Sequence, residues 1–181
     1  FVHGVMNTDN TAISGETLDY GPCAFVDGFE PLRTFSSIDH GGRYALGRQV
    51  PVVLWNLARL ADCLVPLAHA EPAKGAAALD DRLAVFGSAF TSAWSAIQGA
   101  KLGLGTFTPA DQPLSDGLFQ LMTPIRADFT HTFAALAASL ELGGVAPLAA
   151  QLGDGDAVHD WWRRWQDRLA AQGEPTAAVL A

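Results

Sequence analysis

Apolar residues recur at helical spacing through most of the chain. Residues 51–66 begin with a proline that suits a first helical turn, and they carry an apolar stripe at Val53, Leu57, Leu60 and Leu64. Similar stripes, each ended by glycine or proline, predict four further helices: 79–98, 114–122, one after Pro124 that extends to about residue 140, and one from 156 to just before Gly173. The sequence therefore predicts a mainly α fold with a helical bundle over residues 50–181.

The first 22 residues follow a different pattern, which is short, β-like and rich in turns. Ser14-Gly15 is a turn dipeptide flanked by residues 11–13 and 16–18, which predicts a small β-hairpin. In that register Asn10 lies opposite Asp19, and directly opposed residues have Cα atoms about 4.5–5.5 Å apart. The hairpin would therefore bring an amide oxygen and a carboxylate together at its open end.

An irregular stretch rich in glycine and proline links these two parts, over residues 23–49. It is predicted to form one long loop. Loops of this length inside a compact domain are usually functional. At 181 residues the chain is expected to form one domain with a substantial core.

Charge and cysteine content narrow the function classes. The net charge of −8 argues against a sequence-independent nucleic-acid binder, which needs clustered positive charge. The negative charge is compatible with ATP binding, because a divalent cation neutralises the phosphates locally. Cys23 and Cys63 have no pairing pattern and are expected to be free thiols in a reducing compartment. No apolar run reaches the roughly 20 residues of a membrane span.

Asn10 and Asp19 offer the oxygen ligands that magnesium prefers, with room left for phosphate and water. A magnesium–nucleotide site is one hypothesis for this pair. The other is that both side chains simply cap turns, as these residue types often do. A calcium loop is excluded, because no glycine occupies its turn position and no glutamate closes the ligand set.

The spacing of His3 and Asn10 matches the H-R-D-x-x-x-x-N motif of protein kinases, and Asp19-Tyr20-Gly21 resembles D-F-G. Val5 occupies the position of the kinase base and cannot accept a proton. The run H-G-V-M-N-T-D-N at residues 3–10, with D-Y-G-P downstream, is instead similar to the selenoprotein O family of pseudokinase-like protein adenylyltransferases. Residues 39–44, 55–60, 128–130 and the tryptophan-rich last helix also resemble that family.

This resemblance implies an enzyme that binds ATP inverted relative to kinases and transfers AMP to Ser, Thr or Tyr hydroxyls of proteins. It implies that Asp9 accepts the proton and that Asn10 and Asp19 bind Mg²⁺ (or Mn²⁺), with Asp19 also approaching the ATP. The residues alone instead favour Asp9 as a loop residue that bonds nearby backbone amides. Two rival functions stay open: a kinase-like phosphotransferase with Asp9 as its base, and a non-catalytic helical interaction module.

The resemblance also implies an architecture, a protein-kinase-like C-lobe fragment over residues 1–181. Residues 1–22 would be the catalytic and metal loop with its hairpin, 23–49 an activation-loop-like segment, and 50–181 the helical bundle. The chain opens on Phe1-Val2 without a starting methionine or a signal-peptide pattern, and it has no glycine-rich phosphate loop. We therefore expect the C-terminal catalytic portion of a longer bacterial cytoplasmic polypeptide, which is inactive without the N-terminal half. Its expected partners are ATP and protein substrates, with no nucleic acid and no membrane.

Three other features have structural interpretations. His3 is expected to support the loop by hydrogen bonding. The tryptophans at 161, 162 and 165 are predicted to lie in the core. Arg163 and Arg164 are expected to pair with Asp160 along the same helix.

Overall fold

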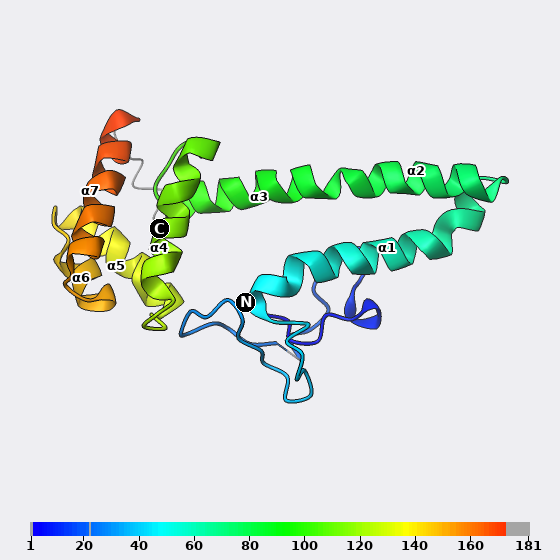
Figure 1. The fold of residues 1–181 in the computed structure, drawn as a ribbon, viewed down its shortest axis with the longest axis horizontal. Coiled ribbons are helices and arrows are strands. Elements are labelled where there is room, and N and C mark those ends of the chain that lie inside the picture. The colour runs from blue at the N-terminus through cyan, green and yellow to red at the C-terminus, as the bar shows by residue number, and fades with distance from the viewer. Residues whose placement is uncertain (1, 22, 173–181) are drawn as a thin grey trace. The chain divides into compact units, whose positions relative to one another are not determined.

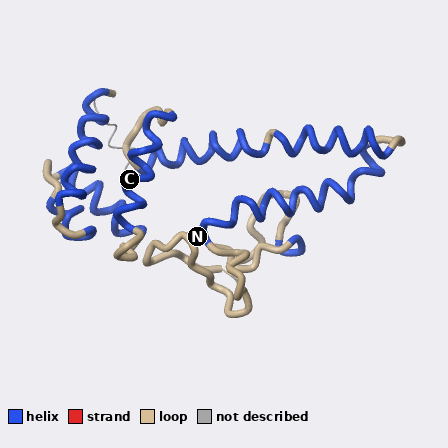
Figure 2. Tube along the Cα trace, in the orientation of Figure 1, coloured by secondary structure: helices blue, strands red, loops and turns tan. Residues whose placement is uncertain are grey.

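The computed structural model describes residues 2–21 and 23–172, which are mainly helical (Figures 1 and 2). The elements in chain order are the 3-10 helix η1 (Thr8–Asn10), the 3-10 helix η2 (Leu46–Arg48), α1 (Gln49–Ala68), α2 (Pro72–Ala84), α3 (Phe86–Lys101), the 3-10 helix η3 (Pro109–Asp111), α4 (Gln112–Met122), α5 (Phe129–Glu141), α6 (Ala146–Leu152) and α7 (Asp156–Ala171). Over the described residues, extended pairing is limited to two isolated antiparallel bridges, Val2 with Ala24 and Gly28 with Asp128.

The chain divides into two compact units. Unit 1 comprises Phe1–Phe25 and Glu30–Phe90, and unit 2 comprises Val26–Phe29 and Thr91–Ala181. Unit 1 contains η1, η2, α1, α2 and the start of α3. The remaining helices belong to unit 2.

Most of the predicted helices are confirmed. α1, α4, α5 and α7 begin and end close to the predicted positions, although α1 continues through Pro66 to its end at Ala68. The single helix predicted over residues 79–98 is wrong. It is two helices, because the backbone N–H of Val85 turns to the carbonyl of Leu83 and closes α2 before α3 begins. The short helix α6 was not predicted.

The predicted β-hairpin around Ser14-Gly15 is also wrong. A turn does form there, with the Gly15 N–H bonded to the Ala12 carbonyl at 3.1 Å, but no ladder follows it. The Asn10 and Thr11 N–H groups instead bond back to Asn7 and Thr8 within and after η1. Ile13 and Leu18 are 86% and 88% exposed, so neither flank of the turn buries an apolar face. Without such a face, the pairing of two short strands is not stable.

Within unit 1, α1 and α2 pack against each other as an antiparallel pair (Figure 1). Their backbones approach closely at Gly75, where a Cβ atom would lie 2.7 Å from the Val65 carbonyl oxygen. Residues 46–68 are long and apolar enough to cross a membrane, with a mean hydropathy of 1.5 and 17% of the window buried. The sequence had predicted no apolar stretch of this length. A single helix of this kind is weak evidence for a membrane protein, and Arg59 and Asp62 form an ion pair on it.

Unit 2 is built around the tryptophans of α7. Trp161, Trp162 and Trp165 are 0%, 5% and 0% exposed, which confirms that they belong to the core. The indole N–H groups of Trp161 and Trp165 donate to the carbonyls of Leu114 and Leu102, both at 2.8 Å. Each buried indole therefore satisfies its polar atom while it fills the space between α7 and its neighbours.

Candidate active site

The predicted catalytic residue Asp9 lies in η1, at the centre of a tightly bonded loop that comprises residues 3–11. The Asn10 side-chain amide donates to the Val5 carbonyl at 2.8 Å, and the Thr11 hydroxyl donates to the Asn7 carbonyl at 3.1 Å. Asp9 itself is exposed. The loop therefore presents a carboxylate to solvent from a backbone that its own side chains hold in place.

The start of this loop depends on Gly4, which is buried and has a φ of 76°. Residues with a Cβ rarely adopt this left-handed conformation, so glycine is favoured here. On either side of Gly4, the Val5 N–H donates to His3 Nδ1 at 3.4 Å, and the His3 N–H donates to Gln49 Oε1 at 3.0 Å. His3 thus makes the supporting contacts expected of it.

Helix α1 holds the other end of the 3–11 loop through Asn56. The Asn56 side-chain amide donates to the Met6 carbonyl at 3.1 Å and to the Thr11 hydroxyl at 2.9 Å. Asn56 is only 4% exposed, so both bonds are partly shielded from water. Its two acceptors lie on either side of Asp9 in the chain. Asn56 therefore fixes the segment that carries the candidate base.

Sequence reasoning did not identify Gln49 or Asn56 as site residues. The signal for Asn56 was its position one helical turn after Val52, on the face of α1 that is buried. A polar residue at such a position is informative, because buried polar groups need partners.

Asp19 is placed by the residues that follow it. Its Oδ1 accepts a 2.8 Å hydrogen bond from the Gly21 N–H. A Cβ atom on residue 21 would lie 3.1 Å from that same oxygen, so glycine leaves space for the carboxylate. Oδ1 is engaged with the backbone, and Oδ2 is left for another ligand.

The donor chemistry of Asn10 and Asp19 fits Mg²⁺. Both are exposed residues with oxygen donors, and each is fixed by a bond to nearby backbone. In the part of the chain that the structure describes, no three His, Cys, Asp or Glu residues form a metal-binding group. Magnesium bound together with a nucleotide needs few protein ligands, so this sparse set is compatible with it. Because the hairpin is absent, the joint binding of one ion by Asn10 and Asp19 stays a prediction that rests on the family pattern.

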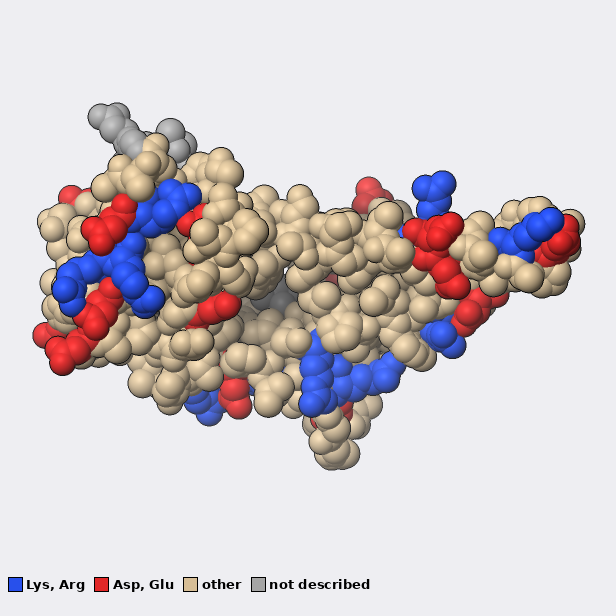
Figure 3. Space-filling model, turned by 45° about the horizontal axis from the view of Figure 1, so that its top comes forward, with Lys and Arg blue, Asp and Glu red and all other residues tan. Residues whose placement is uncertain are grey.

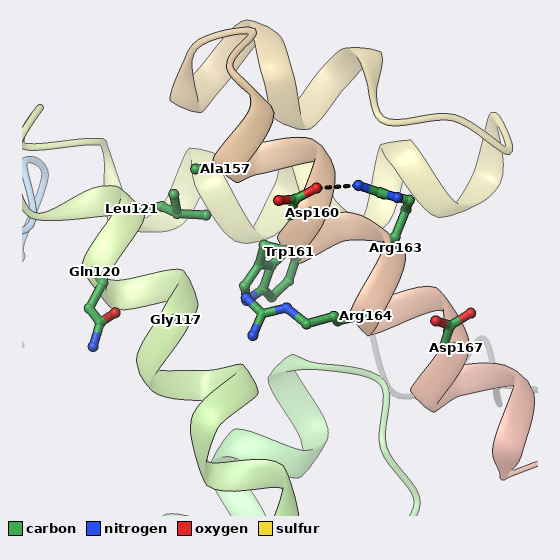
Figure 4. Close-up of a pocket in the computed structure, with 9 residues that line it drawn as sticks. All are labelled: Gly117, Gln120, Leu121, Ala157, Asp160, Trp161, Arg163, Arg164 and Asp167. Carbon is green, nitrogen blue, oxygen red and sulfur yellow. Dashed lines mark hydrogen bonds and ion pairs between the residues drawn. The ribbon is translucent and has the colours of Figure 1, made fainter.

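A separate hollow of about 670 Å³ lies in unit 2, between α4 and α7 (Figure 4). Its lining residues are Gly117, Gln120, Leu121, Ala157, Asp160, Trp161, Arg163, Arg164 and Asp167. Arg163 pairs with Asp160 at its rim, as predicted, whereas the predicted pairing of Arg164 with Asp160 is not found among the described residues. The lining includes none of the predicted site residues. The rim of the hollow is open and lined by exposed charged side chains, and no buried polar group is available to orient a ligand. The hollow is therefore a weaker candidate for the active site than the 3–11 loop.

Comparison with known proteins shows the family to which this chain belongs. A family model described as "Protein adenylyltransferase SelO" matches residues 1–178. The chain belongs to the SelO family. Similar relatives of this family are each called "Protein nucleotidyltransferase YdiU". One from Bradyrhizobium sp. (strain BTAi1) is 46% identical over 181 residues, and one from Rhodopseudomonas palustris (strain BisB5) is 48% identical over 182 residues. Another from Brevibacillus brevis is 45% identical over 179 residues.

These alignments cover 99–100% of this chain but only 35–37% of each SelO relative. The chain thus spans little more than a third of the length of the relatives it matches. Residues 3–11, residues 19–21 and helix α1 all lie inside the matched region.

Proposed function

We propose that this chain is the part of a protein adenylyltransferase that carries the proton acceptor and the metal ligands. The enzyme transfers AMP from ATP to Ser, Thr or Tyr hydroxyls of acceptor proteins. Membership of the SelO family supports this proposal. The structural observation that carries it is the anchoring of the Asp9 loop to α1 by Gln49 and Asn56.

In the proposed reaction, the acceptor hydroxyl oxygen forms a bond to the α-phosphorus of ATP. The bond from that phosphorus to the β-phosphate bridging oxygen breaks, and pyrophosphate leaves. The hydroxyl proton passes to the Asp9 carboxylate, whose exposed position in η1 leaves it accessible to an incoming acceptor. Because the loop that carries Asp9 is anchored to α1 at two points, its backbone loses little freedom when the reactants meet.

Asn10 and Asp19 would hold Mg²⁺, with Mn²⁺ as the alternative ion, and Asp19 would also approach the nucleotide. A divalent ion there offsets phosphate charge as the α-phosphoryl group is attacked. The local bonds of both side chains orient their oxygens before any ligand arrives.

The proposal extends to the rest of the polypeptide. A protein-kinase-like C-lobe is the architecture that we assign, with the ATP-phosphate contacts supplied by the further polypeptide that the relatives have. We place the enzyme in the bacterial cytoplasm, and we expect the 181-residue chain alone to transfer no measurable AMP.

The test replaces Asp9 by Asn in a polypeptide of the relatives' full length that contains this chain. We expect AMP transfer to fall by about 10²–10⁴-fold, because a general base contributes that much, while MgATP binding by calorimetry persists. Asn10→Ala and Asp19→Ala should instead weaken MgATP binding. Glu16→Gln, an exposed carboxylate in the same part of unit 1, is the matched control and should leave transfer unchanged.

Full AMP transfer by the Asp9→Asn variant would show that the catalytic assignment is wrong. Mass spectrometry of the acceptor separates the rival enzyme, since phosphate and AMP add different masses. If the full-length protein binds no MgATP, the non-catalytic interaction module is the correct interpretation.

A further inference from the structure

Positive charge in this acidic chain is concentrated around the start of α1. Residues 31–62 contain four arginines and two aspartates, a net charge of +2 in a chain whose total is −8. The remaining residues therefore carry a net charge of −10. On the face drawn in Figure 3, a group of basic side chains lies over the loop before α1 and over that helix.

An exposed tryptophan lies at the centre of this charge. Trp55 is 43% exposed, and its ring is approached by Arg43 with Cζ 4.6 Å from the centroid and by Arg59 at 5.5 Å. The two guanidinium groups thus lie within about 10 Å of each other, and each gains from the cation–π contact. Arg48 reaches the same loop, donating to the carbonyls of Gly41 and Gly42 at 2.9 and 3.2 Å. We call Arg43, Arg48, Trp55 and Arg59 the arginine–tryptophan surface.

The charges on this surface are available for an external ligand. Among the described residues, Arg43 and Arg48 have no carboxylate partner. Asp39 lies close to Arg43 but uses its two oxygens to accept the backbone N–H groups of Arg43 and Tyr44, both at 2.8 Å. Asp39 therefore holds the loop in shape more than it neutralises a guanidinium.

Arg59 does have a carboxylate partner, Asp62 at 3.0 Å. Their side chains are 49% and 63% exposed, and exposed pairs of this kind are weak. A ligand carboxylate can therefore replace Asp62 at little cost.

The same turns of α1 that form this surface also hold the candidate active site. Asn56, which bonds the 3–11 loop, directly follows Trp55 and precedes Arg59 by less than one helical turn. Whatever binds the arginine–tryptophan surface is thus attached to the helix that positions Asp9.

We propose that the arginine–tryptophan surface binds an acidic segment of the acceptor protein and so selects hydroxyls flanked by Asp or Glu. Guanidinium groups present paired donors that match carboxylates, and arginine and tryptophan dominate the energetics of protein interfaces. A nucleic acid is the poorer occupant, because a long polyanion would meet the negative charge of the rest of the chain. This inference rests on the proposed function, since it names the acceptor of that same site.

The experiment measures binding of a fluorescent serine peptide with four flanking Glu residues to the full-length protein, without nucleotide, by anisotropy. The same peptide with Gln in place of Glu is the ligand control. We expect the Glu peptide to bind more tightly at low salt, and the difference to shrink as salt screens the charges. In the Arg43→Gln/Arg59→Gln variant, affinity for the Glu peptide should fall about tenfold, the effect of losing two exposed charge contacts.

The matched protein control is Arg82→Gln/Arg163→Gln, which removes two exposed arginines elsewhere and should change nothing. Arg43→Lys keeps the charge without the planar fork and should give an intermediate loss. Circular dichroism confirms that each variant is folded. Equal affinity for the Glu and Gln peptides, an unchanged affinity in the double variant, or stronger binding of an RNA oligonucleotide would each overturn the proposal.

A transfer assay separates this inference from the proposed function. If AMP transfer occurs, the double variant should raise KM for the Glu peptide and leave KM for ATP unchanged. An equal rise in KM for both peptides would refute charge recognition while leaving the adenylyltransferase intact. If no AMP transfer occurs but the Glu peptide binds as expected, the arginine–tryptophan surface does bind acidic segments and the proposed reaction is wrong.

Discussion

The Asn56 amide lies 2.9 Å from the hydroxyl of Thr11, a residue 45 positions earlier in the chain. The same amide also donates to the Met6 carbonyl, so one buried side chain bonds the loop both before and after Asp9. The Thr11 hydroxyl in turn donates to the Asn7 carbonyl, which closes the loop on itself. Helix α1 and the 3–11 loop therefore form one bonded assembly.

Loss of this assembly should reduce both the activity and the stability of the fold. Asn56→Ala leaves the Met6 carbonyl without its donor, which costs about 1–3 kcal/mol of unfolding free energy. A loop displaced by about 1 Å should lose about 100-fold in AMP transfer. Steady-state transfer and thermal unfolding of the full-length protein measure the two effects. Thr11→Ser keeps the hydroxyl and should retain most activity; loss of activity in Thr11→Ser equal to that in Asn56→Ala would contradict this role.

Gly21→Ala should weaken MgATP binding while the protein stays folded. The new Cβ would lie 3.1 Å from Asp19 Oδ1, so the carboxylate has to shift slightly and its bond to the Gly21 N–H is weakened. Complete loss of that bond costs about 1 kcal/mol, so Kd by calorimetry should rise by up to about fivefold. Gly41→Ala is the control, because a Cβ there meets nothing within 4 Å. Wild-type affinity in Gly21→Ala would mean that Asp19 does not bind the metal or the nucleotide.

Acid should destabilise unit 2 through Asp111, which is 4% exposed and pairs with Arg168 at 2.5 Å. Burial raises the pKa of this carboxyl, but hydrogen bonds from Arg168 and Thr108 and the Arg168 charge outweigh it, so the pKa lies below its usual 3.8. The unfolded state thus binds the proton more readily. The stabilisation is complete well above pH 3.8 and is lost as the pH falls through the lower folded pKa.

Urea unfolding between pH 7 and pH 3 measures this loss. Asp111→Asn should cost about 2–3 kcal/mol at pH 7, since Arg168 loses its charged partner in a largely buried site. The variant should also show a flatter dependence on acid than wild type. A variant with the wild-type acid dependence would assign that dependence to other carboxylates.

Asp128 should stabilise α5 as its N-cap. Its side chain accepts the His131 N–H at 2.7 Å, which satisfies a donor that the helix leaves unpaired. Asp128→Ala should lower the unfolding free energy by about 1 kcal/mol, whereas Asp128→Asn should keep most of it. Thermal unfolding provides the comparison. If Asn is as damaging as Ala, the negative charge beside His131 matters more than the cap.

The amino-acid pattern alone was sufficient for the helices of residues 112–171 and for the burial of the α7 tryptophans, apart from the short α6. It also indicated which side chains near the N-terminus offer hard oxygen ligands. These properties depend on periodicity and residue chemistry, which act over a few neighbouring positions. The same local reasoning failed at residues 10–19, where the turn was correct but the strands were not.

The tertiary structure decided the attachment of the 3–11 loop to Gln49 and Asn56, and it also brought Arg43 to the ring of Trp55. Hydrogen-bond partners that are 45 or more residues apart leave no periodic pattern in the sequence. Any buried polar side chain within reach can donate to a loop carbonyl, so the sequence does not indicate which one does. Only the packing of the chain on α1 selects which one does. Asn10 and Asp19 hydrogen-bond to nearby backbone groups and not to each other's strand. The two flanks of the turn have no buried apolar face to hold them together as strands.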